Sequence, residues 1–426
     1  MTAPALDPAL IDLMDVSIFE QNQHHSRFNV LRAVPGLHSN PANDHYDPYW
    51  NVVRYADVIT VSRHPEVFSS ASGIVMAPQR QQADAEIAFD GNAKMLITMD
   101  PPRHVRLRRL VNKGFTPRAV AAWEPHIREI TNKLLDRIAA KGECDFVTEV
   151  AANLPLAIIC QMMGVPEKDW DVMFRLTNKT LGSGDPEYQD ELPEGVIPGT
   201  RQAALTTGQQ GFFGMFGYFG QVLQQRRAGQ VAEDLISVLI DAEVDGEKLT
   251  DEEVLWFCFL LILAGNETTR NGISGGMITL DEHPEQKQKL INDLSLLPSA
   301  VEELLRWVSP VTHMARKALD DFEVAGTRIK AGDWVTMWYP SVNRDERIFP
   351  NADVFDITRT PNEHLAFGLG EHFCLGSGFA KLEIRVMFEE LLKRFPDIRV
   401  VGPVERLRSN FLGGIKHLPV AFTPER

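Results

Sequence analysis

The longest helical pattern in the chain follows Thr250. In residues 250–253 (TDEE), Thr stands at the N-cap position and Glu three positions later, which is the signature of a capping box. The helix can continue to His283-Pro284, where the proline ends it. At about 1.5 Å per residue, such a helix reaches on the order of 45 Å, enough to cross a whole domain. We therefore predict that it is the central helix of the fold.

Further helices are predicted through most of the remaining chain. Pro101-Pro102 opens one, and another follows Cys374, with apolar residues on one face at Phe379, Leu382, Val386 and Leu391. Strand patterns are short: residues 49–70 indicate a strand followed by a helix, and residues 322–338 alternate apolar and polar residues around glycine turns. The pattern predicts a mainly α protein with small antiparallel β-sheets.

Residues 1–48 show no periodicity and are rich in Pro, Asn and His, so we predict an irregular N-terminal segment. Residues 49–426 are predicted to form a single domain with one large core. Residues 72–99 also lack a clear period, and long loops of this kind are often functional or mobile.

Composition excludes several classes of protein. The chain is 44% hydrophobic and 24% charged, as in ordered globular proteins. Its net charge of −15 argues against nucleic acid as a partner. The longest apolar run, residues 254–265, is too short to span a bilayer, and the first 15 residues lack the pattern of a secretion signal. We therefore expect a cytoplasmic protein without a membrane span.

The four cysteines, Cys144, Cys160, Cys258 and Cys374, lie far apart and show no CxxC pairing. This spacing disfavours both a disulfide framework and a structural zinc site. Cys374 is different, because a glycine-rich turn precedes it and a helix follows. Backbone N–H groups and the helix dipole favour a thiolate there, which can act as a nucleophile or bind a metal. A buried structural cysteine is the alternative for a lone thiol.

Residues 367–380 (FGLGEHFCLGSGFA) decide between these interpretations. They match all seven specified positions of the haem-binding signature F-G-x-G-x-[HR]-x-C-x-G-x-x-x-A, so the chain resembles the cytochromes P450. The resemblance extends over nearly the whole chain from about residue 50. It implies the cytochrome P450 fold and haem b (heme b, iron protoporphyrin IX), with Cys374 as the thiolate ligand of the iron.

The resemblance also implies which residues contact the haem. Gly368 and Gly370 would let the backbone bend near the sulfur, Gly376 and Ala380 would leave room for the porphyrin, and His372 would bind a propionate. The pair His104 and Arg108, four residues apart on one helix face, and Arg316 match further propionate positions. The full set of haem-contacting residues expected in this way is Leu96, His104, Arg108, Ala264, Gly265, Thr268, Arg316, Phe367, Gly368, His372, Cys374, Gly376 and Ala380.

Residues 264–269 (AGNETT) lie within the predicted central helix. Without the resemblance, the two threonines could simply bond to carbonyl groups one turn back while Glu267 faces solvent. The family's distal motif is [AG]-G-x-[DE]-T-[TS], and all its positions are met. By resemblance, Thr268 is the hydroxyl beside the oxygen, and Glu267 is the acid that brings protons from solvent. Keeping both residues favours a monooxygenase over a peroxide-driven or isomerising P450, or a haem-thiolate sensor of ligand or gas.

Glu303 and Arg306 form an E-x-x-R pair, which alone is a weak signal. Arg359 matches a third position of the family, and the resemblance implies a buried Glu-Arg-Arg cluster that fixes the segment before the cysteine. We expect this trio to be structural.

Between residues 103 and 118 the chain has six Lys or Arg residues and no acid. The run can be incidental, but in this family the same helix docks a small acidic ferredoxin. No flavin or iron–sulfur signature supplies electrons from within the chain, so we expect a ferredoxin with its ferredoxin reductase as partners, and O₂ as co-substrate. The resemblance implies a monomer.

A hydrophobic small molecule is the expected substrate, because the residues expected to face the haem are apolar. They are Val75, Ile97, Leu260, Leu263, Ala264, Val311 and Phe411. For any one of them, a place in the core is an equally good interpretation. Residues 211–220, with four glycines, lie where the family has a mobile lid. The motifs are most similar to the bacterial branch that oxidises sterol side chains, methyl-branched lipids and monoterpenes.

Overall fold

The computed structural model describes residues 6–43, 46–76, 93–230, 232, 234–244 and 246–425. Its helices are α1 (Ser17–Glu20), α2 (His24–Ala33), α3 (Tyr55–Arg63), α5 (Arg103–Val111), α6 (Pro117–Ala122), α7 (Glu124–Ala139), α8 (Asn153–Met162), α9 (Trp170–Leu181), α10 (Arg201–Arg227), α11 (Leu235–Asp241), α12 (Asp251–Glu282), α13 (Pro284–Asn292), α14 (Leu297–Val308), α15 (Tyr339–Val342) and α16 (Ser377–Arg394). Its strands are β1 (His38–Asn40), β2 (Tyr49–Val52), β3 (Phe68–Ser69), β4 (Glu143–Asp145), β5 (Glu243–Val244), β6 (Glu247–Lys248), β7 (His313–Ala318), β8 (Phe322–Val324), β9 (Thr327–Ile329), β10 (Trp334–Trp338), β11 (Arg399–Val400), β12 (Glu405–Arg406), β13 (Ile415–His417) and β14 (Pro419–Ala421). Helices dominate, as the sequence predicts.

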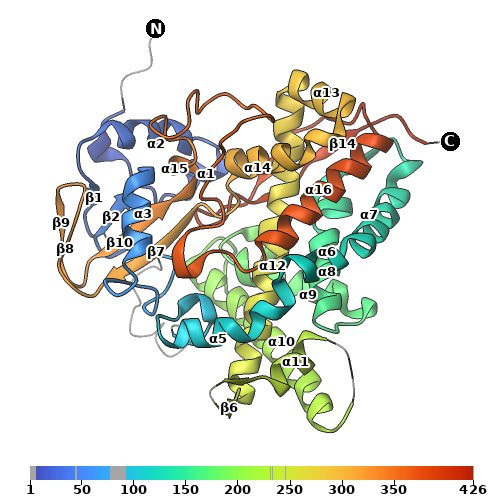
Figure 1. The fold of residues 1–426 in the computed structure, drawn as a ribbon, viewed down its shortest axis with the longest axis horizontal. Coiled ribbons are helices and arrows are strands. Elements are labelled where there is room, and N and C mark those ends of the chain that lie inside the picture. Colours follow the sequence, from blue (N-terminus) through green and yellow to red (C-terminus); the bar gives the residue numbers. More distant parts are fainter. Residues whose placement is uncertain are drawn as a thin grey trace.

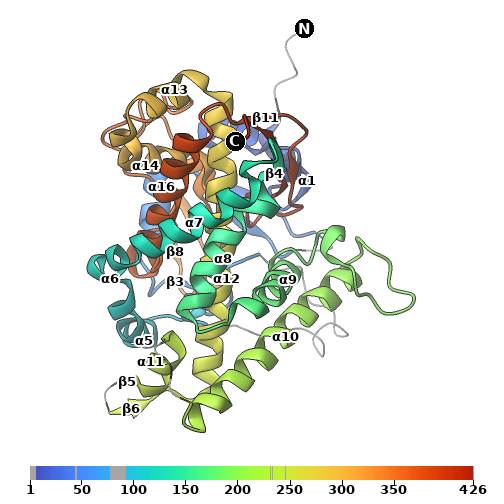
Figure 2. The same ribbon diagram turned by 90° about the vertical axis from the view of Figure 1, so that its right-hand side faces the viewer.

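Helix α12 runs through the middle of the molecule and is surrounded by other helices (Figures 1 and 2). Its 32 residues give a length of about 48 Å. Thr250 caps it with both hydrogen bonds of the capping box, and most of its side chains are buried. The predicted central helix is therefore confirmed.

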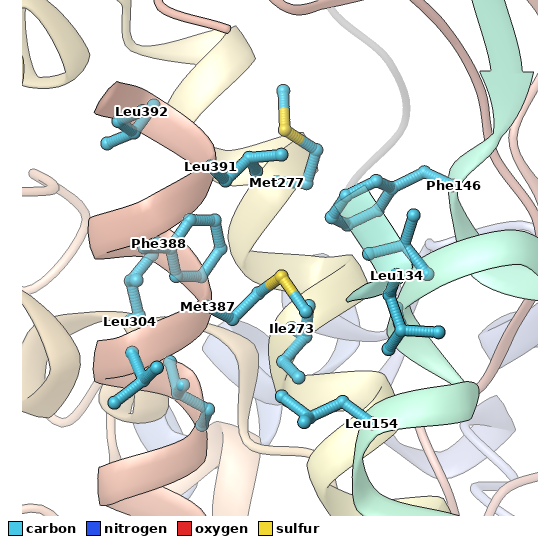
Figure 3. Close-up of a cluster of buried hydrophobic side chains, with 14 of the residues drawn as sticks. Leu134, Phe146, Leu154, Ile273, Met277, Leu304, Met387, Phe388, Leu391 and Leu392 are labelled. Atoms are coloured by element: carbon cyan, nitrogen blue, oxygen red, sulfur yellow. The ribbon is translucent and has the colours of Figure 1, made fainter. Parts of the chain in front are cut away.

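Two glycines let α12 approach its neighbours closely. A Cβ atom at Gly275 would lie 2.6 Å from Val308 of α14, and one at Gly276 would lie 2.8 Å from the ring of Phe388 on α16. Around this contact the side chains interdigitate in one apolar cluster (Figure 3). The residues labelled there are Leu134, Phe146, Leu154, Ile273, Met277, Leu304, Met387, Phe388, Leu391 and Leu392. Helix α16, which follows the cysteine, is thus anchored on α12 and α14.

The main sheet has the strand order β1-β2-β10-β7-β3 and lies beside α2 and α3 (Figure 1). All its pairs are antiparallel except β2 with β10, which are parallel. We predicted one small antiparallel sheet over residues 322–338. Strands β8 and β9 do pair with each other, but β10 pairs with β7 and β2 instead.

The prediction that residues 1–48 are irregular is wrong. This segment contains α2 and β1, and β1 forms the edge of the main sheet. Phe19 stacks on Trp338 of β10 at 5.6 Å between ring centroids, so the segment is packed on the body. The division of the chain into this segment and a single domain at 49–426 stays a prediction.

Residues 77–92 of the expected long loop lie outside the described residues, and Leu96–Thr98 forms a short 3₁₀ helix. Among the described residues, no helix combines the length and apolarity that crossing a bilayer requires.

Candidate active site

Cys374 lies in a tight loop between a short 3₁₀ helix (Gly370–His372) and α16. Its N–H donates to the carbonyl of Phe367 at 2.9 Å, which closes the loop. Gly368 and Gly370 have φ angles of +70° and +72°, and a Cβ at Gly370 would lie 2.8 Å from the carbonyl oxygen of Ser62. Only glycine fits this combination of angle and space, which explains why the motif has glycine at these positions.

The environment of the Cys374 sulfur acts on its ionisation in two directions. Burial raises the pKa of the thiol, whereas the backbone N–H groups of Gly376 and Ser377 and the charge of Arg108 lower it. Donors and a positive charge around the sulfur are the features that stabilise a thiolate. Burial outweighs these groups in the protein alone, where the pKa of the thiol stays raised, so a bound metal ion would be needed to hold the sulfur as a thiolate.

Arg108 on α5 lies against the cysteine loop. It donates to the carbonyl of Glu371 at 2.9 Å and also to the carbonyl of Phe373, the residue before the cysteine. The structure thus gives Arg108 a role in positioning the loop, and its predicted bond to a haem propionate stays a prediction.

A cluster of basic side chains faces the other edge of the loop. The rings of His104 and His372 lie 4.2 Å apart, and Arg316 on β7 is 7% exposed with a single hydrogen bond, to the carbonyl of Ala315 at 2.7 Å. Burial and the charges of Arg108 and Arg316 lower the pKa of His104 to about 4, although Asp100 opposes them. Burial, Arg316, His104 and Arg108 lower the pKa of His372 to about 2.

No carboxylate of the described residues forms an ion pair with this cluster, although the charge of Asp100 acts on His104 and Arg316. Among the described residues, Arg316 has no ion-pair partner, and Nδ1 of His104 is buried without a hydrogen bond. Buried polar atoms normally have partners, so two arginines and two neutral histidines fit the two carboxylates of a haem. All four residues were predicted from the sequence, and the structure brings them together.

The site also has the open space that a flat cofactor needs. A Cβ added at Gly376 would meet nothing within 4 Å. Ala264 is exposed in the middle of α12, although Leu263 and Glu267 beside it are buried. The residues present therefore fit a haem between the cysteine loop and the centre of α12.

Thr268 and Glu267 differ in their surroundings. The hydroxyl of Thr268, which is half-buried, donates to the carbonyl of Ala264 at 2.9 Å. Glu267 is 1% exposed and forms an ion pair with Arg270, which is 2% exposed. Burial raises the pKa of Glu267, and Arg270 opposes this shift. The expectation that this acid reaches solvent is therefore wrong in this conformation.

Sequence reasoning missed the residues that hold Glu267. Arg270 donates to Asn178 of α9 at 3.0 Å, and Asn266 donates to Thr177 of α9 at 3.1 Å. The position of Arg270 one turn after Glu267 was a signal, whereas nothing in the sequence pointed to α9. Gly265 faces α8, because a Cβ there would lie 3.0 Å from Ile159. It therefore serves helix packing, and its expected closeness to the haem stays a prediction.

The predicted structural trio meets at a fully buried carboxylate. Glu303 accepts two hydrogen bonds from Arg306, at 2.7 and 2.8 Å, and two from Arg359, at 3.1 and 3.2 Å. Arg306 also donates to the carbonyls of Asn343 and Ala352, at 2.8 and 2.9 Å. The cluster thus ties α14 to the segment that leads to the cysteine loop.

The predicted pocket residues come from three places. Ile97 lies in the 3₁₀ helix beside α12, which carries Leu260, Leu263 and Ala264. On the sheet side, the carbonyl of Ile74, next to Val75, accepts from the N–H of Ala315, and Val311 pairs with Leu412, next to Phe411. The structure places Leu263 and Leu96 in the apolar core around α12.

Two of the four glycines in residues 211–220 of α10 pack against α9, whereas a Cβ at Gly217 or Gly220 would meet nothing within 4 Å. A Cβ at Gly211 would collide with the side chain of Thr180, and one at Gly214 would collide with Leu176. Helix α10 is continuous over 27 residues and crosses beside α12 (Figure 2). Gly211 and Gly214 therefore bring α9 and α10 together, and none of the four glycines interrupts the helix. Opening of this region as a lid stays a prediction.

Comparison with known proteins agrees with this geometry. The family model "Cytochrome P450" matches residues 32–398. A methyl-branched lipid omega-hydroxylase of Mycobacterium tuberculosis is 41% identical over 380 residues, covering 88% of this chain and 84% of the relative. A steroid C26-monooxygenase of Mycolicibacterium smegmatis is 38% identical over 378 residues, with the same coverage of 88% and 84%.

Solved structures give the same result. A cytochrome P450 of Mycobacterium marinum in complex with pseudoionone superimposes with a TM-score of 0.85 at 34% identity, covering 99% of this chain and 100% of that one. The predicted fold, cofactor and reaction class are therefore confirmed: the enzyme is a monooxygenase and its cofactor is haem b. The chain belongs to the cytochrome P450 family.

Proposed function

We propose that this monooxygenase inserts one oxygen atom of O₂ into a C–H bond of a hydrophobic terpenoid, sterol or branched-chain lipid. Relatives that act on methyl-branched lipids and on steroids support this substrate class. The apolar residues Leu260, Val311 and Phe411 around the predicted pocket are consistent with it. The observation that carries the proposal is the Cys374 loop beside a buried basic cluster that forms no ion pair among the described residues.

We assign Cys374 as the iron ligand, and His104, Arg316 and His372 as the residues that orient the haem carboxylates. The bound haem, with a thiolate ligand, supplies the oxygen chemistry that can attack an unactivated C–H bond. The protein contributes the glycine turns that shape the cysteine loop, and the N–H donors and the Arg108 charge that partly offset the effect of burial on the ionisation of the sulfur.

Thr268 and Glu267 are proposed as the proton relay. The Thr268 hydroxyl donates to the carbonyl of Ala264 at the open stretch of α12, so it can accept a hydrogen bond from the pocket as it stands and has to rotate to donate one there. Glu267 is the adjacent acid, and Arg270 holds it while Asn178 holds Arg270. For Glu267 to supply a proton, its ion pair with Arg270 has to rearrange.

We propose a ferredoxin, reduced by a ferredoxin reductase, as the electron donor. Arg109, Lys113 and Arg118 on or near α5 are exposed, and among the described residues they have no ion-pair partner. Phe373, next to the cysteine, is 42% exposed. Exposed cations on or near the helix that contacts the cysteine loop, together with an exposed apolar side chain in that loop, fit a small acidic protein. A monomeric, cytoplasmic enzyme is part of the same proposal.

The substrate class is tested by measuring ligand-induced shifts of the ferric Soret band. The panel contains a methyl-branched fatty acid, its straight-chain isomer, a sterol and a monoterpene, followed by turnover with ferredoxin, reductase and product identification. We expect shifts and hydroxylated products with the branched or polycyclic compounds. Shifts without any product would support the sensor alternative, and turnover with peroxide alone would support a peroxide-driven enzyme.

A further inference from the structure

The connection between α9 and α10, residues 182–200, is fastened to the hairpin of β12 and β13 by charged side chains. Asp185, which is 3% exposed, accepts from the N–H of Arg408 at 3.1 Å and from Nζ of Lys416 at 3.2 Å. Nζ of Lys416 also lies 2.8 Å from the carboxylate of Glu187. Elements more than 200 residues apart in sequence are thus joined at one place.

His417, the neighbour of Lys416, is held between two carboxylates. Its Nδ1 lies 2.5 Å from Oδ2 of Asp145, and its Nε2 lies 3.0 Å from Oε1 of Glu187. A neutral imidazole has one N–H donor and one lone pair, whereas an imidazolium has two donors. With both carboxylates ionised, the two contacts are both hydrogen bonds only when the ring is protonated, so the geometry favours a charged His417.

The two contacts of His417 are not equivalent. Asp145 belongs to the body of the molecule: it ends β4, which pairs with β14, and it also accepts from the N–H groups of Val147 and Leu418 at 3.0 and 3.1 Å. Glu187 belongs to the α9–α10 connection. If the ring loses one proton, the shorter contact to Asp145 keeps the remaining N–H, and the lone pair then faces Glu187. Loss of the proton therefore weakens the contact that crosses to the connection.

The other charged groups at this place reinforce the effect. One carboxylate oxygen of Glu187, one of Glu405 on β12 and one ring nitrogen of His417 all lie within 4.8 Å of one another. Four carboxylates (Asp145, Asp185, Glu187 and Glu405) thus surround two cations, Lys416 and His417. Hydrogen bonds to Asp145 and Glu187 raise the pKa of His417 above its ordinary value of 6.5, although burial opposes the shift. A neutral His417 leaves Lys416 as the sole cation of this group of six.

We propose that His417 is a pH-sensitive latch, which fastens the α9–α10 connection to the C-terminal hairpin when protonated and loosens this attachment when neutral. His417 has a higher pKa in the closed form than as a free imidazole, whose pKa is near 6.5. It therefore stabilises the closed form fully below about pH 6.5, and this stabilisation is lost as the pH rises through the pKa of the closed form. The latch is therefore closed in mild acid and weakened in mild base.

The position of the connection gives the latch a function. The ring of Tyr188 packs over Gly182 at the end of α9, one turn beyond Asn178, which holds Arg270 and through it Glu267. The hairpin leads to Phe411, whose carbonyl accepts from Thr312 beside Val311. Release of the connection would open a route between α9 and this hairpin for a hydrophobic substrate. This last step rests on the proposed function, whereas the latch itself does not.

The latch is tested by amide hydrogen exchange of the haem-loaded protein, measured for peptides from residues 182–200 at about pH 6 and about pH 8.5 and corrected for intrinsic exchange. We expect the opening of this segment to increase with pH, by about tenfold for each unit by which the pKa of His417 is raised. His417→Gln should lose this pH dependence, because glutamine does not titrate. His126→Gln, on α7 and outside the cluster, should keep it.

Glu187→Gln provides a second variant should His417→Gln fail to fold, and it should lose the pH dependence as well. An opening that is the same at both pH values in the unmodified protein would overturn the proposal, as would a His417→Gln variant that keeps the native dependence. The measurement is repeated with EDTA, and a dependence that disappears with the chelator would point to a bound cation and against the proton. None of these results depends on turnover, so the latch and the proposed function can fail separately.

Discussion

At the scale of single residues, the hydroxyl of Thr268 is the group whose removal is most informative. In Thr268→Ala, the oxygen pocket loses the donor that lies beside Ala264, and general acid catalysis of this kind is typically worth about 10²–10⁴ in rate. We expect product formed per electron pair consumed to fall at least about tenfold, with the electrons recovered as hydrogen peroxide. Thr268→Ser keeps the hydroxyl and should remain largely coupled. Full coupling in the alanine variant would refute the assigned role.

The buried pair Glu267 and Arg270 makes a prediction about stability and pH. Removing one partner of a buried ion pair typically costs about 3–5 kcal/mol, because the other charge is left unpaired. In Arg270→Met, the charge that lowers the pKa of Glu267 is gone and only burial remains, so this pKa rises further. The unfolded carboxyl ionises near pH 4.3, and therefore the variant should lose stability as pH rises above that value, up to the raised pKa.

Urea unfolding of Arg270→Met between about pH 5 and about pH 8 measures this loss. The double variant Glu267→Gln/Arg270→Met removes the titrating group and should recover part of the stability, with no added pH dependence. A single variant as stable at the upper pH as at the lower one would show that the carboxyl is not buried as described.

At the scale of elements, the trio at Glu303 connects α14 to the segment before the cysteine. Glu303→Gln leaves two guanidinium groups, that of the fully buried Arg306 and that of the partly buried Arg359, around a neutral side chain. We expect a loss of about 3–5 kcal/mol in the free energy of unfolding and weaker haem retention. Asp321→Asn breaks an exposed pair with Arg328 and should change stability by less than about 0.5 kcal/mol. Equal effects of the two changes would contradict a structural role for the trio.

Helix α5 carries the prediction on electron transfer. Charge reversal at Arg109 and Lys113 should slow reduction by the ferredoxin about tenfold or more at low salt, and the difference should shrink as salt screens the interaction. Arg137→Glu, an exposed cation on α7, is the matched control. Stopped-flow reduction measures both. Unchanged kinetics in the α5 variant would exclude this docking face.

At the scale of the whole molecule, the sequence predicted those features that depend on residues close together in the chain. The capping box at Thr250 fixed the start of α12, and the cysteine motif identified a loop whose glycines adopt left-handed angles. The pairing of β10 with β2 and β7 could not be predicted, because the partners of Trp334 lie 17 and 285 residues earlier in the chain. For the same reason, the contact between Arg270 and Asn178 has no local signature.

The N-terminal segment was misinterpreted for a different reason. Helix α2 buries Arg32 together with Phe28 and Leu31, so a charged residue occupies one of the positions where a helical period expects an apolar one. That arginine donates to Ser341, and its side chain lies 3.5 Å from Glu346. Because the polar partners of Arg32 come from distant elements, the sequence of α2 lacks a clear apolar period, and the segment was predicted to be irregular.

The central claim is that the sulfur of Cys374 is the ligand of the haem iron, and the spectrum of the ferrous carbonyl adduct tests it most directly. We predict the long-wavelength Soret band of thiolate coordination in the purified protein and its loss in Cys374→Ser. A native adduct with the absorption of imidazole coordination, or a Cys374→Ser variant that keeps the thiolate spectrum, would contradict the account.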